Sequence, residues 1–246
     1  MIKTKELKEN QPWNLSYKMS LEARPSWSKH GMPALFEEFT RLVKNGQNNR
    51  GIHLDIGCGN GVKTVNFALA SFYTVGIDIS DNGFKEAREL IKEFRVSKKC
   101  KIIKANCLEL PFKDKSIRSA SDILCFTHLK TKDHKKCISE LGRVLKSGAY
   151  VLLVLFSDKD EHFHGHKVSK KYSFRFNPNN PLMEGYAHYH GMYNVHFDRD
   201  DIEKSFSEKF KIIDAQEVKH EIYPHRFLWN VILQKPLEDN VKSQKN

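Results

Sequence analysis

Apolar and polar residues follow two different periods along the chain, and these periods predict strands that alternate with helices. Short apolar runs predict buried strands, whereas apolar residues at every third or fourth position predict helices. The predicted strands cover residues 51–56, 74–79, 100–105, 119–126, 150–156, 210–218 and 227–234. The predicted helices cover residues 33–43, 62–69, 84–94, 133–145 and 198–206. The alternation of strands and helices up to residue 156 is typical of a parallel sheet with helices on both faces.

The segment at residues 51–61 has the pattern of a ligand cradle. An apolar strand breaks into Gly57-Cys58-Gly59-Asn60-Gly61 and then feeds a predicted helix. Glycine permits positive φ and close backbone approach, and a helix start offers unpaired N–H groups. The next strand carries Asp78 near its end, where a carboxylate can accept both hydroxyls of a ribose. A glycine-rich turn without a ligand is the alternative.

Two nucleotide-binding patterns are candidates for this turn. The dinucleotide fingerprint G-x-G-x-x-G fails, because position 62 is a valine. The string D-x-G-x-G-x-G that begins at Asp55, followed by V-G-I-D-I-S at residues 75–80, resembles the class I S-adenosylmethionine-dependent methyltransferases. A carboxylate two positions before the first glycine favours a sulfonium and an amino group, and it would repel a pyrophosphate.

Later segments resemble the same family, with departures. Residues 106–112 resemble its D-A-x-x-L-P-F segment, although Asn106 replaces the aspartate, and residues 143–149 resemble its R-V-L-K-P-G-G helix exit. Residues 114–118 occupy the place of its D-x-S-F-D segment, but Arg118 replaces the second aspartate. The predicted fourth strand that follows is unusually polar, with Ser119, Ser121 and Asp122.

The resemblance implies a fold and a division of the chain. The implied fold is α/β, a doubly wound and mostly parallel seven-stranded sheet with a C-terminal antiparallel hairpin and an insertion before the sixth strand. Residues 1–50 would be an N-terminal cap segment and helix, and residues 51–236 the methyltransferase domain. Within it, residues 157–197 would be an irregular substrate lid, and residues 237–246 a polar tail.

The resemblance also implies S-adenosyl-L-methionine as cofactor and S-adenosyl-L-homocysteine as product. Asp55 and the glycines would hold the methionine end, and Asp78 would hold the ribose. The implied cofactor-binding residues are Asp55, Gly57, Cys58, Gly59, Gly61, Asp78, Ile79, Asn106, Cys107, Cys125 and Phe126.

Asp122 and His128, near and just after the end of the predicted fourth strand, are the candidates for catalysis. Asp122 lies near the end of the fourth predicted strand and could orient a substrate, or it could be an ordinary strand-end carboxylate. His128 could act as a general base, since its ordinary pKa allows this, or it could be a structural hydrogen-bonding residue.

Aromatic and histidine residues predict a substrate pocket built partly from the insertion. Aromatic walls with a few polar groups are typical of small-molecule sites. The candidates are Trp27, Tyr186, His188, Tyr189, His190 and Tyr193. Trp27 could instead pin its segment to the core. Alternating histidines could bind a transition metal, but no cysteine or carboxylate spacing completes a site, so no metal is predicted.

Composition narrows the choice of compartment and acceptor. Five cysteines without a C-x-x-C pair, no signal-like start and no long apolar run favour a cytoplasmic protein without a membrane partner. The net charge of +11 suits either an RNA partner or lysines spread over solvated helix faces.

The favoured acceptor is an N, O or S nucleophile of a small molecule. RNA is the alternative, because D-I-G-C-G-N-G also resembles methyltransferases of the tRNA wobble uridine. A non-catalytic protein that binds S-adenosylmethionine is a third class.

Overall fold

The computed structural model describes residues 32–46, 50–160, 165–167, 173–176, 193–219 and 226–238. Its main strands are β1 (Ile52–Ile56), β2 (Tyr73–Asp78), β3 (Cys100–Lys104), β4 (Ile117–Ile123), β5 (Leu145–Ser157), β9 (Lys211–Lys219) and β10 (Phe227–Gln234). Its helices are α2 (Phe36–Asn45), α3 (Val62–Leu69), α4 (Phe84–Glu93), α5 (Thr131–Val144), α6 (Arg199–Phe206) and the short 3-10 helix η2 (Phe126–His128). Within these residues, no helix is long and apolar enough to cross a membrane.

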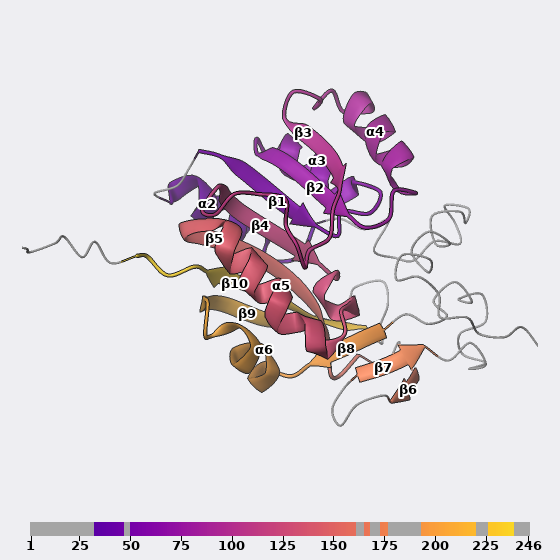
Figure 1. The fold of residues 1–246 in the computed structure, drawn as a ribbon, viewed down its shortest axis with the longest axis vertical. Coiled ribbons are helices and arrows are strands. Elements are labelled where there is room, and N and C mark those ends of the chain that lie inside the picture. The colour runs from indigo at the N-terminus through magenta and orange to yellow at the C-terminus, as the bar shows by residue number, and fades with distance from the viewer. Residues whose placement is uncertain are drawn as a thin grey trace, which may run out of the picture.

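The seven main strands lie in the order β3-β2-β1-β4-β5-β10-β9 (Figure 1). The first five pair in parallel, and β10 and β9 complete the sheet as an antiparallel hairpin. The predicted fold class is therefore confirmed. The predicted fourth strand ends too late, because β4 stops at Ile123 and the chain then turns into η2.

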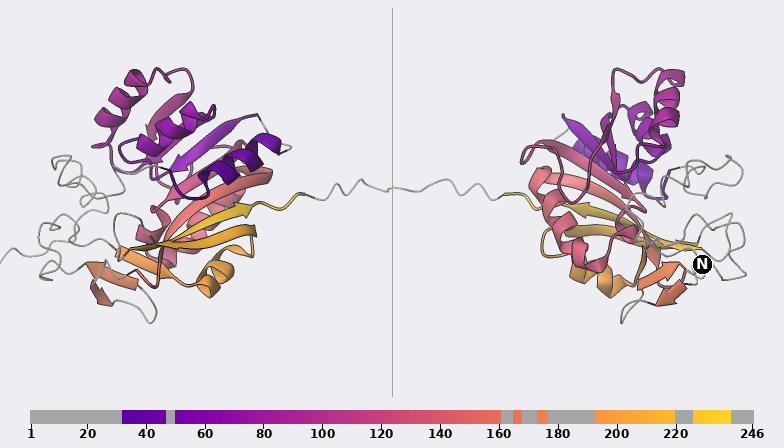
Figure 2. Two further views of the ribbon diagram at one scale, coloured as in Figure 1. Left: turned by 180° about the vertical axis from the view of Figure 1, so that it is seen from behind. Right: turned by 45° about the vertical axis from the view of Figure 1, so that its right-hand side comes forward.

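The insertion contains strands that its sequence did not predict. These are β6 (Gly165–Lys167), β7 (Ser173–Phe176) and β8 (Tyr193–Phe197). β5 continues three residues beyond Val154, the partner of Ile123 at the end of β4, and β8 pairs in parallel with the last two of them, Phe156 and Ser157. Antiparallel pairing then adds β7 and β6 (Figure 2). An irregular insertion is thus wrong for these residues, because an unused stretch of strand edge supplies their hydrogen bonds.

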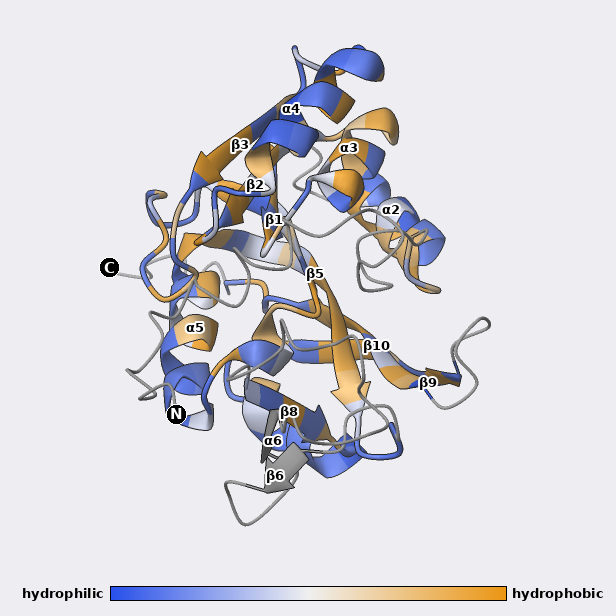
Figure 3. Ribbon diagram, turned by 90° about the vertical axis from the view of Figure 1, so that its right-hand side faces the viewer, coloured by the Kyte–Doolittle hydropathy of each residue, from blue (hydrophilic) through white to orange (hydrophobic). Residues whose placement is uncertain are grey.

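Helices cover both faces of the sheet, as its apolar strands require. β5 shows the division: Val151 and Leu153 belong to the core that α5 and α6 cover, and Leu152 belongs to the core beneath α2. α5 lies in front of the sheet in Figure 1, and the reverse view in Figure 2 brings α2 forward. Figure 3 shows β5 as a nearly continuous apolar strand between these layers.

The strand order places a crevice beside β1. From β1 the chain runs outward through β2 to β3, and it then returns to β4 on the other side of β1. Ligands of open α/β sheets bind at such a reversal, outside the carboxyl ends of the strands. The glycine-rich turn after β1 lies at this point.

Candidate active site

The turn between β1 and α3 can be built only with glycine at two of its positions. Gly57 and Gly61 have φ of 69° and 79°, a region that side chains disfavour. A Cβ on Gly57 would lie 2.4 Å from the Cβ of Cys125, and one on Gly61 would lie 2.7 Å from the Cβ of Ala87. The turn is therefore pressed against two neighbouring elements, and its backbone forms one wall of the site.

Asp78 joins the end of β2 to this turn. Its Oδ2 accepts a hydrogen bond from the Gly59 N–H at 2.9 Å, and its Oδ1 accepts one from the Ser80 N–H at 2.8 Å. Burial raises the pKa of Asp78, while these two bonds oppose the shift. A carboxylate oxygen can accept more than one hydrogen bond, so Asp78 is fixed in place and can still bind a hydroxyl. Ile79 follows it and is half-buried.

Asp55 is held beneath the turn by two hydroxyl groups. Thr64 donates to its Oδ2 at 2.6 Å, and Ser121 donates to its Oδ1 at 2.7 Å. Burial raises the pKa of Asp55 to about 6, although both hydrogen bonds favour the ionised form. Asp55 therefore presents a negative charge to the site at neutral pH.

The polar residues of β4 support Asp55 through a buried histidine. Parallel pairing places Ser119 beside His53 and Ser121 beside Asp55. The His53 ring nitrogens lie 3.0 Å and 3.1 Å from the two serine hydroxyl oxygens. Because Ser121 gives its proton to Asp55, it accepts from Nε2–H of His53, and Nδ1 accepts from Ser119. Burial lowers the pKa of His53, so this neutral tautomer persists at pH 7.

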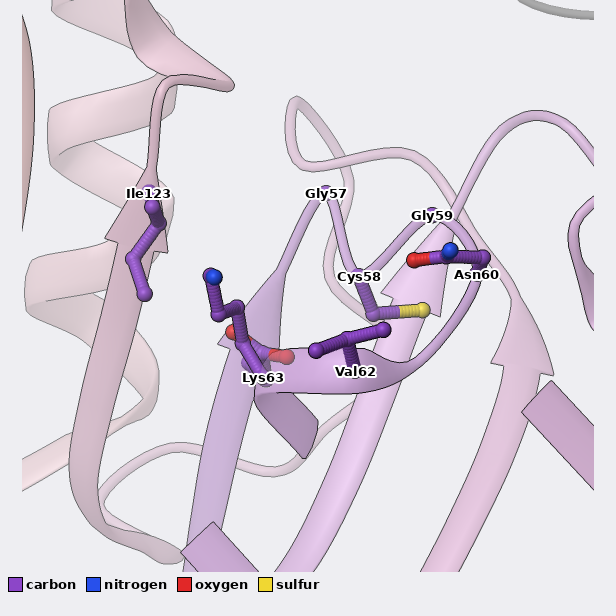
Figure 4. A pocket seen from close by; sticks show the side chains of 8 residues that line it. Gly57, Cys58, Gly59, Asn60, Val62, Lys63 and Ile123 are labelled. Carbon is purple, nitrogen blue, oxygen red and sulfur yellow. The ribbon is translucent and has the colours of Figure 1, made fainter. Parts of the chain in front are cut away.

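A pocket opens between the glycine turn and β4 (Figure 4). Asp55 forms part of its lining, together with the turn itself. Two other lining residues, Lys63 on α3 and Ile123 at the end of β4, were not predicted from the sequence. Lys63 fits the polar positions of an amphipathic helix, so its sequence context gives no signal that it faces a ligand.

The residues predicted for the adenine end lie after β3. Asn106 is exposed, and its Oδ1 accepts a hydrogen bond from the Leu108 N–H at 2.9 Å. Its second lone pair is available in this geometry. The Cys107 thiol is buried beside the free thiols of Cys125 and Cys137 and interacts with both, so its backbone is the part that a ligand can reach. Three cysteines that are scattered in sequence are thus neighbours.

Asp122 has a clear structural function. Its Oδ1 accepts hydrogen bonds from the N–H groups of Cys125 and Phe126, each at 2.9 Å, and so fixes the start of η2. Burial raises the pKa of Asp122 to about 8. The Phe126 side chain packs in the core, which leaves its backbone for ligand contact. A contact between Asp122 and a substrate stays a prediction.

His128 and Tyr193 are brought together although 65 residues separate them. His128 Nδ1 lies 3.1 Å from the Tyr193 carbonyl oxygen, which can only accept, so Nδ1 carries the proton. Burial lowers the pKa of His128 to about 4. The ring is therefore neutral at pH 7 but is a weak base, and its role as general base stays a prediction.

Beyond η2, charged and aromatic residues gather around one ring. We call His128, Phe156, Asp160, His196 and Arg226 the Phe156 cluster. The rings of His128 and His196 lie 5.4 Å and 5.5 Å from the Phe156 ring, and the Arg226 guanidinium lies 5.2 Å from it. Arg226 Nε is 3.6 Å from Asp160 Oδ2, and both side chains are buried. Sequence reasoning missed this cluster, because its members come from separate segments.

The other predicted substrate residues lie outside the described residues. These are Trp27, Tyr186, His188, Tyr189 and His190. Their roles, and the division of the chain into cap, lid and tail, stay predictions.

Comparison with known proteins agrees with this geometry. A family model described as a methyltransferase domain matches residues 54–153. An uncharacterized protein, MJ0638, of Methanocaldococcus jannaschii is 33% identical over 142 residues, which cover 56% of this chain and 57% of that protein. A ubiquinone/menaquinone biosynthesis C-methyltransferase of Geobacter is 32% identical over 47% of this chain and 50% of its own length. A tRNA (carboxymethyluridine(34)-5-O)-methyltransferase of Arabidopsis thaliana is 32% identical over 44% of this chain and 24% of its own length. The chain thus spans about half the length, or less, of most of the curated relatives it matches.

Solved structures share the fold over most of the chain at low sequence identity. A SAM-dependent methyltransferase of Methanosarcina mazei has a TM-score of 0.68 and 22% identity, covering 85% of this chain and 100% of that one. The 1,6-didemethyltoxoflavin-N1-methyltransferase of Burkholderia thailandensis, solved with 1,6-didemethyltoxoflavin and S-adenosylhomocysteine, has a TM-score of 0.65 and 15% identity over 90% of this chain and 84% of its own. Residues 54–153 thus match a methyltransferase domain, and the described chain shares the fold of S-adenosylmethionine-dependent methyltransferases, including their strand order and the glycine turn after β1.

Proposed function

We propose that this protein binds S-adenosylmethionine at the carboxyl edge of β1, β2 and β4 and transfers its methyl group to an acceptor. One observation carries the proposal. The glycine turn is hydrogen-bonded to Asp78 on one side and lies above the buried carboxylate of Asp55 on the other. A backbone cradle between two fixed carboxylates suits a ligand with a ribose at one end and an ammonium group at the other.

The fit of the cofactor follows from these groups. Asp78 would accept from the ribose hydroxyls, because each of its oxygens is already oriented by one backbone N–H. Asp55 would attract the amino group of the methionine end, since its carboxylate is ionised above pH 6. Asn106 and the Cys107 backbone would border the adenine. S-adenosylmethionine supplies a methyl group that is already activated by a sulfonium.

The protein's own contribution to the reaction would be placement of the acceptor and exclusion of water. A positioned nucleophile reacts with a strong entropic advantage, and a closed site removes competing solvent. Asp122 would act through η2, because it accepts from the N–H groups of Cys125, which precedes η2, and of Phe126, its first residue. Cys125 touches the glycine turn and precedes η2, so this short helix joins the cofactor side to the acceptor side.

A small molecule is the acceptor that we favour. The Phe156 cluster places buried polar and aromatic groups next to η2, and such a mixture is typical of small-molecule pockets. The Burkholderia thailandensis neighbour, whose structure holds a small-molecule acceptor, covers 90% of this chain.

RNA is the second candidate, and two observations favour it. The net charge is +11, and the Arabidopsis thaliana relative is named as a tRNA methyltransferase. Titration with bulk tRNA at low and moderate salt separates the candidates. An RNA enzyme should bind tRNA with an affinity that falls steeply as salt rises, and a small-molecule enzyme should not bind it. Cofactor binding without turnover on either acceptor class would favour a non-catalytic protein.

The cofactor site is tested by calorimetric titration of Asp78 variants with S-adenosylmethionine. Asp78→Ala should abolish measurable binding, and Asp78→Asn, which keeps one oxygen acceptor, should weaken it. Asp81→Ala is the matched control, because Asp81 is an exposed carboxylate three residues away that pairs with Lys104. Unchanged affinity in a folded Asp78→Ala variant would overturn the assignment of the cofactor site.

A further inference from the structure

Lys63 is a cation inside the proposed cofactor pocket that the glycine motif does not explain. It lies in the first turn of α3, and its half-buried side chain lines the pocket with the glycine turn and Ile123. Figure 4 shows the side chain rising between that turn and β4. A lysine that served only solubility would point from α3 toward solvent. This one points toward the ligand space.

The charge of Lys63 is balanced within the pocket by carboxylates. Burial lowers the pKa of Lys63 to about 8, and the Asp55 carboxylate on β1 opposes this shift. Asp78, at the end of β2, is the next acidic group along the turn, and the Cys58 thiol between them has its pKa raised by burial, so it is neutral. Lys63 is therefore mostly protonated at pH 7. Its ammonium stands near a carboxylate whose own two oxygens already accept from Thr64 and Ser121.

The position of this pair indicates which end of a ligand would meet it. Asp78 marks the ribose position at β2, whereas Lys63 and Ile123 lie toward β4, on the other side of β1. The ligand end that reaches this side is the amino-acid end, which carries one ammonium and one carboxylate. Asp55 and Lys63 offer the two complementary charges side by side.

We propose that Lys63 binds the carboxylate of the methionine end of S-adenosylmethionine and so selects ligands that keep this carboxylate. The inference rests on the proposed function, because it assigns a residue to the same cofactor. It adds a positive group to a site whose predicted residues are carboxylates, glycines and neutral side chains.

The test is a thermodynamic cycle between a lysine variant and a ligand that lacks the carboxylate. S-adenosylmethionine and decarboxylated S-adenosylmethionine are titrated by calorimetry into the full chain and into Lys63→Met. Loss of a charge-assisted hydrogen bond should weaken S-adenosylmethionine binding about 10- to 100-fold. Binding of decarboxylated S-adenosylmethionine should change less than about threefold, and Lys63→Arg should retain most of the affinity for the full ligand.

Lys92→Met is the matched control, because Lys92 is an exposed lysine in the last turn of α4. It should leave both affinities unchanged. Equal losses for both ligands in Lys63→Met, or no loss for either, would overturn the role of Lys63 alone. Failure of the unmodified chain to bind either ligand would instead overturn the proposed function, so the two failures are distinguishable.

A second measurement does not depend on the stability of Lys63→Met. Binding enthalpies are measured at pH 8.5 in two buffers of different ionisation enthalpy, for the unmodified chain and for Lys63→Arg. A carboxylate bound to Lys63 stabilises its charged form, so the unmodified chain should take up more protons on binding than the arginine variant. The ligand's own amino group titrates in the same range and contributes equally to both. Equal proton uptake by the two proteins would contradict the proposal.

Discussion

The proposed cofactor side and the proposed acceptor side of this site are built in different ways. On the cofactor side, each carboxylate oxygen of Asp55 and Asp78 accepts a short hydrogen bond, and the residues lie within one continuous stretch plus its neighbour β4. On the acceptor side, the Phe156 cluster joins a buried ion pair and two histidines around a ring, from segments far apart in the chain. A backbone cradle needs consecutive residues, whereas an acceptor pocket needs only side chains that meet in space. One side is therefore recognisable as a motif and the other is not.

The largest effect should come from breaking the ion pair of the acceptor side. Arg226→Met removes the cation beside the fully buried Asp160, and an uncompensated buried charge typically costs about 3–5 kcal/mol. Denaturant unfolding measures the loss. Arg199→Met is the control, because Arg199 forms an exposed pair with Glu203 that should contribute less than about 1 kcal/mol. S-adenosylmethionine affinity should be unchanged in the folded variant. Similar losses for both arginines would contradict the difference between the two sides.

A smaller effect is expected from filling the glycine turn. Gly57→Ala places a methyl group 2.4 Å from Cys125 at a φ of 69°, which should cost about 2–4 kcal/mol and reduce cofactor affinity. Gly142→Ala, within α5, is a matched control because nothing lies within 4 Å of the added atom. It should raise stability by about 0.5–1 kcal/mol. Thermal unfolding of both variants measures this, and a neutral Gly57→Ala would show that the turn yields easily.

The smallest effect concerns the charge of Asp55 and its pH dependence. The folded pKa of about 6 exceeds the ordinary value of 3.8, so the folded state binds more protons between pH 4 and 6. Stability contributed by this group is present below pH 4 and is lost as pH rises through 6. Asp55→Asn removes this loss of stability, but the amide NH2 cannot accept one of the two hydroxyl hydrogen bonds. We therefore expect the variant to be more stable than the unmodified chain by about 1 kcal/mol at pH 8.

Unfolding midpoints at pH 5 and pH 8 measure the gain from Asp55→Asn, and Asp214→Asn on β9 provides a control at a half-buried carboxylate that accepts a hydrogen bond from Gln216. The gain should shrink at pH 5, and cofactor affinity should fall at both values. A variant that is less stable than the unmodified chain at pH 8 would show that Asp55 is not strained by burial.

Local patterns predicted most of the fold, and they also provide the residues of the proposed cofactor side. The strands and helices up to β5 follow from periodicity, and Asp55, the glycines and Asp78 follow from one motif. The support for Asp55 was not predictable, because His53 meets Ser119 and Ser121 only through the parallel register of β1 with β4. The polarity of β4, a departure in the sequence, is explained by that register.

The features that the sequence did not predict depend on contacts between segments that are far apart in the chain. β8 forms because β5 extends beyond the end of β4 and leaves an edge with which residues 193–197 can pair. The sequence of residues 193–197 alone does not indicate this pairing. Lys63 has the sequence context of a surface lysine. Its side chain lines the pocket only because α3 packs over β1 and β2, which the local sequence does not show. Arg226 directly precedes β10, and its partner Asp160 follows β5. The sequence of neither segment indicates that the two residues form an ion pair.

Calorimetric titration of the unmodified chain with S-adenosylmethionine tests the central claim most directly. The proposed function predicts one saturable site, and a dissociation constant on the order of micromolar would correspond to a binding free energy of about −8 kcal/mol. S-adenosylhomocysteine should compete for that site, because it keeps the ribose and the amino acid that Asp78, Asp55 and Lys63 would bind. Absence of binding to the folded protein at millimolar ligand would contradict the account.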